Sequence, residues 1–311
     1  MKIVAFAGGV GGAKLADGLS RCLPGKDLTV IVNTGDDFVH WGLKICPDLD
    51  TVCYTLAGLA NPETGWGRSD ESWQVFENMR ALGSADWFRI GDKDLATHIE
   101  RTRRLKAGQT LSQVVHDFCV AWGVGANILP ATDQFLATLV NTAEQGELTF
   151  QEYFVHQRCK PTVKSFRFDG LQNAQPAPGV LQAIHQADAI VFCPSNPWVS
   201  IDPILKIPGI FPAIADKLIV AISPIIAGQT VKGPAAKMFT ELGIVPSATA
   251  VAKHYEKILS GFVLDLLDAD LANELQNIGI TPLVVNTLIK TNVERQKLAQ
   301  DVLHFIERLI S

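Results

Sequence analysis

Short continuous runs of apolar residues alternate with amphipathic stretches along the first part of the chain. Residues 2–7 (KIVAFA) and 28–32 (LTVIV) are runs typical of strands buried on both faces of a parallel sheet. Between them, Leu15, Leu19 and Leu23 recur at helical spacing. The pattern therefore predicts a strand, a glycine-rich turn, a helix and a second strand, which is a right-handed βαβ unit.

The same alternation returns in the second half of the chain. The pattern predicts strands over residues 189–193, 217–223 and 283–285. It predicts helices over residues 180–186, 232–242 and 293–309, the last with one apolar face. Strands that alternate with helices in this way indicate an α/β fold with a doubly wound, mainly parallel sheet.

The middle of the chain is patterned differently. Two helices are predicted over residues 94–105 and 111–122, followed by two strands over residues 148–156 and 162–168. This order indicates a smaller α+β lobe, residues 62–170, inserted beside the sheet. The core, residues 1–61 and 171–311, is then the part predicted to bind a nucleotide or another donor.

Composition excludes several classes of protein. With 47% hydrophobic and 19% charged residues, the 311-residue chain can bury a sizeable core, which excludes intrinsic disorder. The net charge of −5 disfavours general nucleic-acid binding, which needs a concentrated basic surface. The longest apolar stretch, residues 218–228, is much shorter than the roughly 20 residues of a membrane span. None of the six cysteines forms a C-x-x-C pair, so we expect reduced thiols in a cytoplasmic protein without a membrane partner.

A glycine-rich turn follows the first predicted strand and opens the first predicted helix. Its sequence, GGVGGAK, contains Gly8, Gly9, Gly11, Gly12 and Lys14. Such turns let the backbone approach a phosphate, and the amides of a helix N-terminus bind anions. The turn lacks the Gly-Lys-Ser/Thr of a Walker loop, and a dinucleotide fingerprint needs a small residue where Lys14 stands. It therefore predicts an anion site of another type, with a merely tight turn as the alternative.

Four aspartates lie in two segments after the second predicted strand. Asp36 and Asp37 end the segment NTGDD, and Asp48 and Asp50 lie in PDLD. Carboxylate oxygens are ligands that Mg²⁺ prefers, so all four are candidate metal ligands. Asp36 and Asp37 could instead bind a ribose hydroxyl or a basic neighbour, or stabilise a turn. Asp50 could simply cap a helix predicted over residues 51–59.

Three further segments carry polar side chains that suit a binding site. Arg89 begins RIGDKD, and Asp94 in that segment shares a helix face with His98. A lone histidine is more often a packed or surface residue than a base, so catalysis by His98 is the weaker interpretation. The other two segments follow predicted strands and supply Ser195, Asn196, Lys232, Gly233 and Lys237. Together these loops form the lining expected of a nucleotide or phosphate site.

The motifs, taken in order, carry a family resemblance. GGVGGAKL, NTGDD, CPDLDTVCYTLAG, GWG, RIGDKDLATH, NILPATD, PSNPWVSIDPIL, ISPIIAG and GPAAK run from residue 8 to residue 237. In this combination the chain resembles the 2-phospho-L-lactate transferase family, and the wider resemblance covers nearly its whole length. The resemblance implies a Rossmann-like sheet with a smaller lobe, usually in a homodimer.

The resemblance also implies an activity, which belongs to the biosynthesis of the deazaflavin coenzyme factor 420. A phospho-three-carbon-acid group, 2-phospho-L-lactate or phosphoenolpyruvate, would pass from a guanylyl-diphospho donor to the ribityl hydroxyl of 7,8-didemethyl-8-hydroxy-5-deazariboflavin. GMP would leave, and Mg²⁺ would be required. Asp50 and Arg89 match the positions that contact the deazaflavin, and Asp50 is the candidate catalytic residue.

Two other functions are weighed against this one. A non-catalytic nucleotide-sugar-binding regulator of a related family shares the glycine-rich start and the Asp-Asp turn. An NAD-linked oxidoreductase is suggested only by the glycine-rich turn, and Lys14 disfavours it. The segment Pro-Asp-Leu-Asp-Thr-Val, residues 47–52, favours the transferase.

Overall fold

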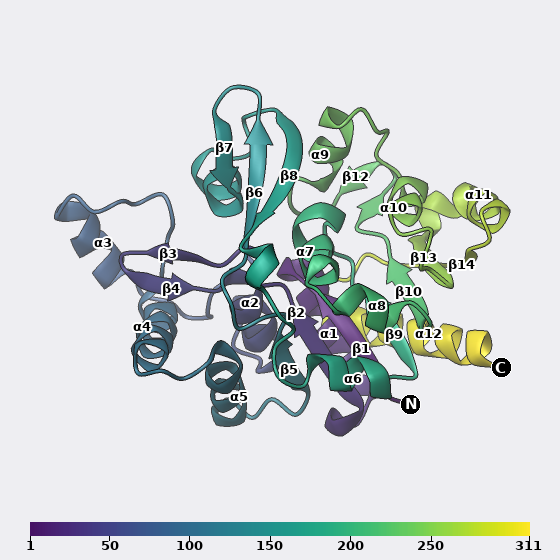
Figure 1. Ribbon diagram of the computed structural model, residues 1–311, viewed down its shortest axis with the longest axis horizontal. Coiled ribbons are helices and arrows are strands. Elements are labelled where there is room, and N and C mark those ends of the chain that lie inside the picture. The colour runs from purple at the N-terminus through teal and green to yellow at the C-terminus, as the bar shows by residue number, and fades with distance from the viewer.

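A central parallel sheet organises the molecule, which we describe from a computed structural model of residues 1–311. Its seven strands have the order β14-β13-β10-β9-β1-β2-β5 (Figure 1). Their bounds are β1 Ile3–Ala7, β2 Leu28–Val32, β5 Asn127–Pro130, β9 Ala189–Phe192, β10 Leu218–Ile222, β13 Gly261–Asp265 and β14 Thr281–Val285. The predicted α/β fold with a doubly wound, mainly parallel sheet is thus confirmed.

Helices cover both faces of this sheet, because its strands are apolar on both sides. In β1, Ile3, Ala5 and Ala7 belong to one hydrophobic core, while Val4 and Phe6 belong to the other. The first core packs against helices α1 Gly9–Cys22, α2 Pro47–Leu56, α5 Leu111–Ala121 and α12 Asn292–Ile310. The second packs against α6 Val180–Gln186, α7 Asp202–Lys206, α8 Ile210–Ile214, α9 Ala235–Glu241, α10 Ala248–His254 and α11 Ala272–Asn277.

The strand order reverses between β1 and β9. From β1 the chain winds to β2 and β5 on one side, whereas β9, β10, β13 and β14 extend the sheet on the other. The β1–β9 and β1–β2 pairs are both parallel, so the carboxyl ends of these strands meet at one edge. Ligands of open α/β sheets bind beside such a point of reversal.

Smaller elements project from the sheet (Figure 1). On one side lie a hairpin and two helices, with the bounds β3 Phe38–His40, β4 Leu43–Ile45, α3 Gln74–Ala81 and α4 Asp92–Lys106. Next to them stands a three-stranded antiparallel sheet, with the bounds β7 Gly146–Thr149, β6 Ala137–Thr142 and β8 Val163–Asp169. A short hairpin, β11 Ile225–Ile226 and β12 Gln229–Thr230, follows β10.

The structure differs from the sequence-based expectations in the middle of the chain. The range 62–170 contains β5, which pairs with β2 and forms the edge of the central sheet. This range therefore does not lie wholly beside the sheet, and the division into domains stays a prediction. The strand predicted over residues 148–156 is wrong in its second half, because the chain turns into a π-helical segment at Glu152–His156. The helix predicted over 51–59 begins earlier, at Pro47, which suits the first turn of a helix.

All six cysteines are free, and four of them are buried. Cys53 on α2 and Cys119 on α5 place their sulfur atoms 3.7 Å apart. None of the helices is long and apolar enough to cross a membrane.

Candidate active site

A cavity of about 760 Å³ opens at the carboxyl edge of the sheet, where the strand order reverses. Four strands deliver their following loops to its wall, namely β1, β9, β10 and β14. Asp36, which follows β2, and residues in the first two turns of α2 also line the cavity. The volume lies within the roughly 300–1,000 Å³ typical of sites for small molecules. The predicted loops therefore converge, as the carboxyl ends of parallel strands require.

The glycines of the first turn serve the packing of the surrounding loops. A Cβ atom at Gly8 would lie 2.6 Å from the Cβ of Ser200, and one at Gly11 would lie 2.3 Å from the carbonyl oxygen of Pro194. A Cβ at Gly12 would lie 2.8 Å from the Oγ of Ser195. Gly9 has a φ of +63°, in the left-handed region that favours glycine. These positions thus need glycine whether or not a phosphate binds.

The N-terminus of α1 already holds an anion supplied by the protein. The backbone N–H of Gly9 donates to Oδ1 of Asp48 over 2.8 Å. Asn33 donates through Nδ2 to the other oxygen of Asp48, over 2.9 Å. This carboxylate uses one amide of the turn, and the positive end of the helix stabilises it there. The binding of a donor phosphate at this turn stays a prediction.

Asp36 and Asp48 form an acidic pair in the cavity wall, and both are buried. Burial raises the pKa of Asp48 to about 6. Burial, assisted by the charge of Asp48, holds the pKa of Asp36 well above its usual range. Oδ1 of Asp36 is buried and has no hydrogen-bond partner. Burial therefore favours the uncharged form of both carboxyl groups, and a cation bound between them would favour the charged form.

Asp37 differs from its neighbour Asp36. It does not line the cavity, and its Oδ2 lies 3.1 Å from the Nζ of Lys44. The thiol of Cys46 donates to the same oxygen over 3.1 Å. Asp37 is therefore already neutralised inside the protein, which suits a structural role for this carboxylate.

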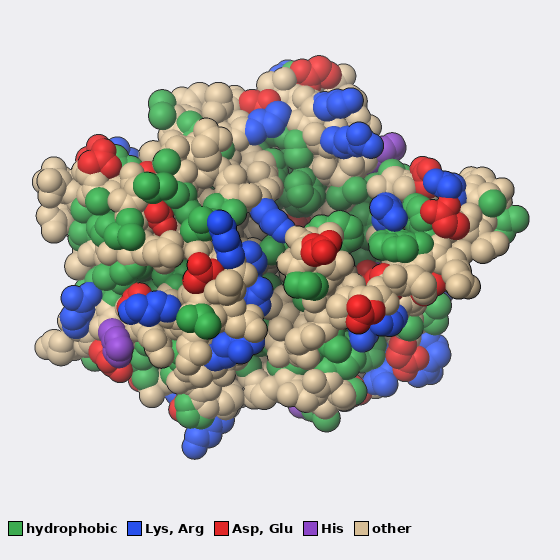
Figure 2. Space-filling view, turned by 180° about the vertical axis from the view of Figure 1, so that it is seen from behind, with side chains coloured by type: hydrophobic (Ala, Val, Ile, Leu, Met, Phe, Trp, Pro, Cys, Tyr) green, Lys and Arg blue, Asp and Glu red, His purple; other side chains and the backbone are tan.

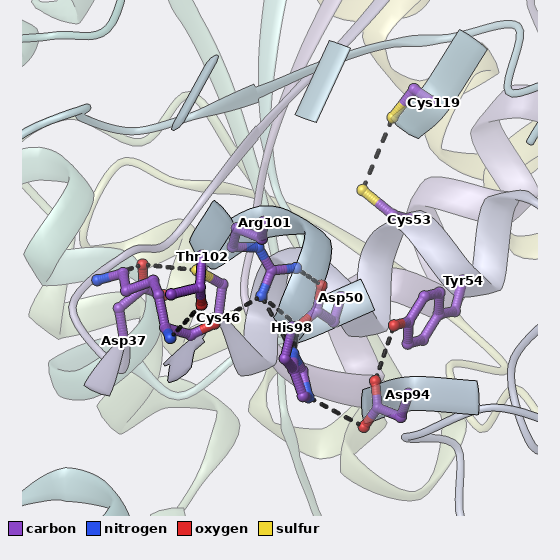
Figure 3. Close-up of polar contacts among 11 residues, drawn as sticks. Asp37, Cys46, Asp50, Cys53, Tyr54, Asp94, His98, Arg101, Thr102 and Cys119 are labelled. Carbon is purple, nitrogen blue, oxygen red and sulfur yellow. Dashed lines mark hydrogen bonds and ion pairs between the residues drawn. The ribbon is translucent and has the colours of Figure 1, made fainter. Parts of the chain in front are cut away.

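Asp50 also lines the cavity, and side chains of α4 contact its carboxylate (Figure 3). Both carboxylate oxygens accept hydrogen bonds from the guanidinium of Arg101. Nδ1 of His98 lies 3.6 Å from Oδ2 of Asp50. On its other side, Nε2 of His98 lies 3.3 Å from Asp94, which accepts a 2.7 Å hydrogen bond from the hydroxyl of Tyr54. Asp50 is thus one end of a buried polar network.

Positively charged side chains reach the cavity although the chain is acidic overall. Lys14 and Lys232 line it, and Nζ of Lys14 donates to the carbonyl of Ile289 over 2.9 Å. Burial lowers the pKa of Lys14, and the charges of Arg295 and Lys232 add to this effect. Lys and Arg side chains also gather along the middle of the face shown in Figure 2. A local field of this kind attracts anionic ligands.

Lys237 does not line the cavity. Its Nζ forms an ion pair with Glu241 and donates to the carbonyl of Pro161 over 3.0 Å. Gly233 does line the cavity, as do Ser195 and Asn196. The hydroxyl of Ser195 donates to the carbonyl of Gly8 over 2.8 Å, so this residue joins the two central loops.

Aromatic side chains also line the cavity, and Arg89 lies among the lining residues. The guanidinium of Arg89 stacks 4.3 Å from the ring centre of Trp73. The aromatic lining residues are Tyr54, Trp66, Trp87, Phe88, Phe150 and Phe154. Most of them were missed from the sequence, although Trp87 and Phe88 directly precede Arg89. Arg101 was missed too, and its only sequence signal is its place one helical turn after His98.

Comparisons with known proteins agree over nearly the whole chain. A family model described as 2-phospho-L-lactate transferase CofD matches residues 3–302. A protein of Streptomyces griseus named phosphoenolpyruvate transferase is 47% identical over 287 aligned residues, and the match covers 90% of each chain. One of the same name from Streptomyces coelicolor is 44% identical over 302 residues, covering 94% of this chain and 95% of the other.

Solved structures share the fold. A crystal structure of a UPF0052-family protein from Bacillus halodurans superposes with a TM-score of 0.64 at 17% sequence identity. The match covers 97% of this chain and 98% of that one. From the family match and the level of identity to its relatives, the chain belongs to the CofD family and is a transferase.

Proposed function

We propose that this chain transfers a phospho-three-carbon-acid group from a guanylyl-diphospho donor to the ribityl hydroxyl of 7,8-didemethyl-8-hydroxy-5-deazariboflavin. The group is phosphoenolpyruvate rather than 2-phospho-L-lactate, because the similar Streptomyces proteins bear the name phosphoenolpyruvate transferase. The observation that carries the proposal is one cavity that combines an acidic pair, lysines and an aromatic wall. A homodimer stays a prediction of the family resemblance.

The cavity is lined by two chemically different sets of side chains, which suit two different substrates. Lys14 and Lys232 suit the diphosphate of the donor, which carries several negative charges. The aromatic side chains around Arg89 suit a flat ring system, which they can stack against. Asp50 lines the same cavity, where it can accept a hydrogen bond from an acceptor hydroxyl.

Asp36 and Asp48 fit a divalent cation better than Asp37 and Asp50 do. Both line the cavity, and Oδ1 of Asp36 is buried without a partner. Asp37 and Asp50 are already paired with Lys44 and Arg101. Mg²⁺ commonly binds one or two carboxylates together with substrate phosphates, and there it would offset the charge of the diphosphate. We therefore narrow the four candidate ligands to Asp36 and Asp48.

The side chains of the cavity can support a direct displacement. The acceptor hydroxyl attacks the phosphorus that carries the three-carbon acid, and a new oxygen–phosphorus bond forms. The bond from that phosphorus to the bridging oxygen breaks, and GMP leaves with this oxygen. The proton of the hydroxyl passes to Asp50 or to solvent. Most of the catalysis in such transfers comes from positioning and charge neutralisation, which Asp50, Lys14 and Lys232 supply.

The test of this function is an assay for GMP with purified protein, Mg²⁺, the deazaflavin and competing donors. Donors that carry phosphoenolpyruvate, phospholactate or phosphoglycerate compete in one reaction, and mass spectrometry identifies which group the deazaflavin product carries. We expect GMP and a product bearing the phosphoenolpyruvate group. Tight nucleotide binding with no GMP from any donor would contradict the proposal and favour a regulator.

The placement of the donor gives a separate prediction. Replacing Lys14 by methionine should raise the Kd for GDP about tenfold, because one charge contact to phosphate is lost, equivalent to about 1.4 kcal/mol. Lys217 provides the matched control, since its Nζ also donates to backbone carbonyls, of His185 and Ala187, outside the cavity. Calorimetric titration of Lys14→Met, Lys217→Met and the unaltered protein measures the effect. Equal Kd values in all three would refute the placement.

A further inference from the structure

Arg101 is a buried charge that does not line the cavity. Only 1% of its surface is exposed, and it is the largest of the fully buried side chains. A guanidinium is almost never buried to this extent unless an anion pairs with it, because it loses its hydration. The burial of Arg101 therefore requires a buried anionic partner.

The partner of Arg101 is the cavity residue Asp50 (Figure 3). Nη1 donates to Oδ2 of Asp50 over 3.1 Å, and Nη2 donates to Oδ1. Nη1 also donates to the carbonyl of Lys44 over 3.2 Å, which ties the guanidinium to β4. A planar fork on both oxygens fixes the direction of a carboxylate as well as its charge.

His98 supports this arrangement from the same helix. Its Nδ1 lies 3.3 Å from Nη1 of Arg101, and a guanidinium nitrogen can only donate. In the tautomer with the proton on Nε2, which faces Asp94, Nδ1 presents its lone pair to Arg101. In that tautomer His98 contacts the guanidinium without competing for Asp50. Asp94 is itself held by the hydroxyl of Tyr54.

A metal ion is the rival explanation for this cluster. Ligand atoms of Asp50, Asp94 and His98 all lie within 4.8 Å of one another. However, Arg101 already donates one hydrogen bond to each oxygen of Asp50, and its Nη1 lies 3.3 Å from Nδ1 of His98. A cation placed among these groups would face a fixed positive charge in a buried site. The geometry therefore assigns the role of the cation to Arg101.

We propose that Arg101 is a positioning residue, which fixes the orientation of the Asp50 carboxylate in the cavity wall so that it can accept a hydrogen bond from the acceptor hydroxyl. This inference rests on the proposed function, because it needs the acceptor to bind beside Asp50. It gives α4 a part in the reaction although Arg101 itself touches no substrate. The fork, rather than the charge alone, is what the role requires.

A double-mutant cycle tests the proposal. Arg101→Met, Asp50→Asn and the double variant are compared for the Kd of the deazaflavin, measured by its fluorescence, and for kcat of GMP release. If Arg101 acts through Asp50, each single variant loses at least tenfold in kcat and in acceptor affinity. The double variant is then no worse than Asp50→Asn, and the Kd for GDP changes less than twofold throughout. Losses that multiply in the double variant would overturn the proposal.

Two further variants separate positioning from folding. Arg101→Lys keeps the charge without the fork, so we expect its melting temperature to approach that of the unaltered protein while kcat stays at least fivefold low. Activity that simply follows the melting temperature would instead indicate a structural role and contradict the proposal. Arg104→Met is the matched control, because Arg104 lies on α4 but pairs with Glu100 and Asp117 at the surface.

The result for the unaltered protein separates failure of the proposed function from failure of the proposed role of Arg101. If it neither binds the deazaflavin nor releases GMP, the proposed function fails and the role of Arg101 fails with it. If it does both and the cycle is additive, only the role of Arg101 is refuted.

Discussion

Replacing Asp50 by asparagine is expected to lower kcat for GMP release at least a hundredfold. Asp50 is the carboxylate of the cavity that is already oriented, and it can accept the proton of the attacking hydroxyl. Loss of a positioned proton acceptor typically costs about 10²- to 10⁴-fold in rate. Asparagine keeps the shape and one oxygen, so the change reports on the charge and the basicity of this group.

The matched control is Asp17→Asn. Asp17 is also a buried carboxylate paired with arginines, Arg21 and Arg295, but it lies on α1 outside the cavity. Both variants remove a buried carboxylate from its ion pair, so both should lose stability, and Asp50→Asn should lose more because Arg101 is buried while Arg21 and Arg295 are partly exposed. Only Asp50→Asn should lose activity when the two are assayed well below their melting temperatures. Activity of Asp50→Asn within twofold of the unaltered protein would exclude the catalytic role.

Removal of divalent cations is expected to lower turnover by more than tenfold, with recovery on addition of Mg²⁺ or Mn²⁺. Burial disfavours the charged forms of Asp36 and Asp48, and a divalent cation would stabilise both carboxylates while it offsets the charge of the diphosphate. Protein is stripped with EDTA, passed over a desalting column and assayed during a Mg²⁺ titration. Full turnover in excess EDTA would mean that Lys14 and Lys232 neutralise the donor unaided.

The ligands themselves can be tested in the same titration. Asp36→Asn should need at least tenfold more Mg²⁺ for half-maximal activity, because it removes one carboxylate of the pair. Asp17→Asn should need no more Mg²⁺ than the unaltered protein. A Mg²⁺ requirement unchanged in Asp36→Asn would move the metal to another place in the cavity.

The sequence predicted the parallel core because its strands are continuous apolar runs. Residues 2–7 and 28–32 read in this way and form β1 and β2. β5 and β13 were missed, although each lies within the central sheet. β5 has only four residues and ends at a proline. β13 begins with Gly261, which the sequence marks as a turn but which the packing of Phe305 requires, since a Cβ there would lie 2.7 Å from its ring.

The sequence predicted the loops of the candidate site but not the tertiary contacts of its side chains. Loops after parallel strands meet at one edge, so motif position alone brought Gly8, Lys14, Ser195 and Gly233 to one cavity. The sequence could not show which acidic groups were already neutralised, because Lys44 and Arg101 reach Asp37 and Asp50 only through tertiary packing. The aromatic wall was missed for the same reason. Its residues come from segments as far apart as Trp66 and Phe154.

The contacts of the glycine-rich turn bear on how such motifs are used to classify proteins. Gly8, Gly11 and Gly12 are required by Ser200, Pro194 and Ser195, and Asp48 already occupies the start of α1. The glycines of the turn therefore indicate how closely the neighbouring loops pack against it. A sequence search that used this turn alone would find proteins with the same loop packing, whatever ligand they bind. The discriminating information lies in the acidic and aromatic positions that line the cavity.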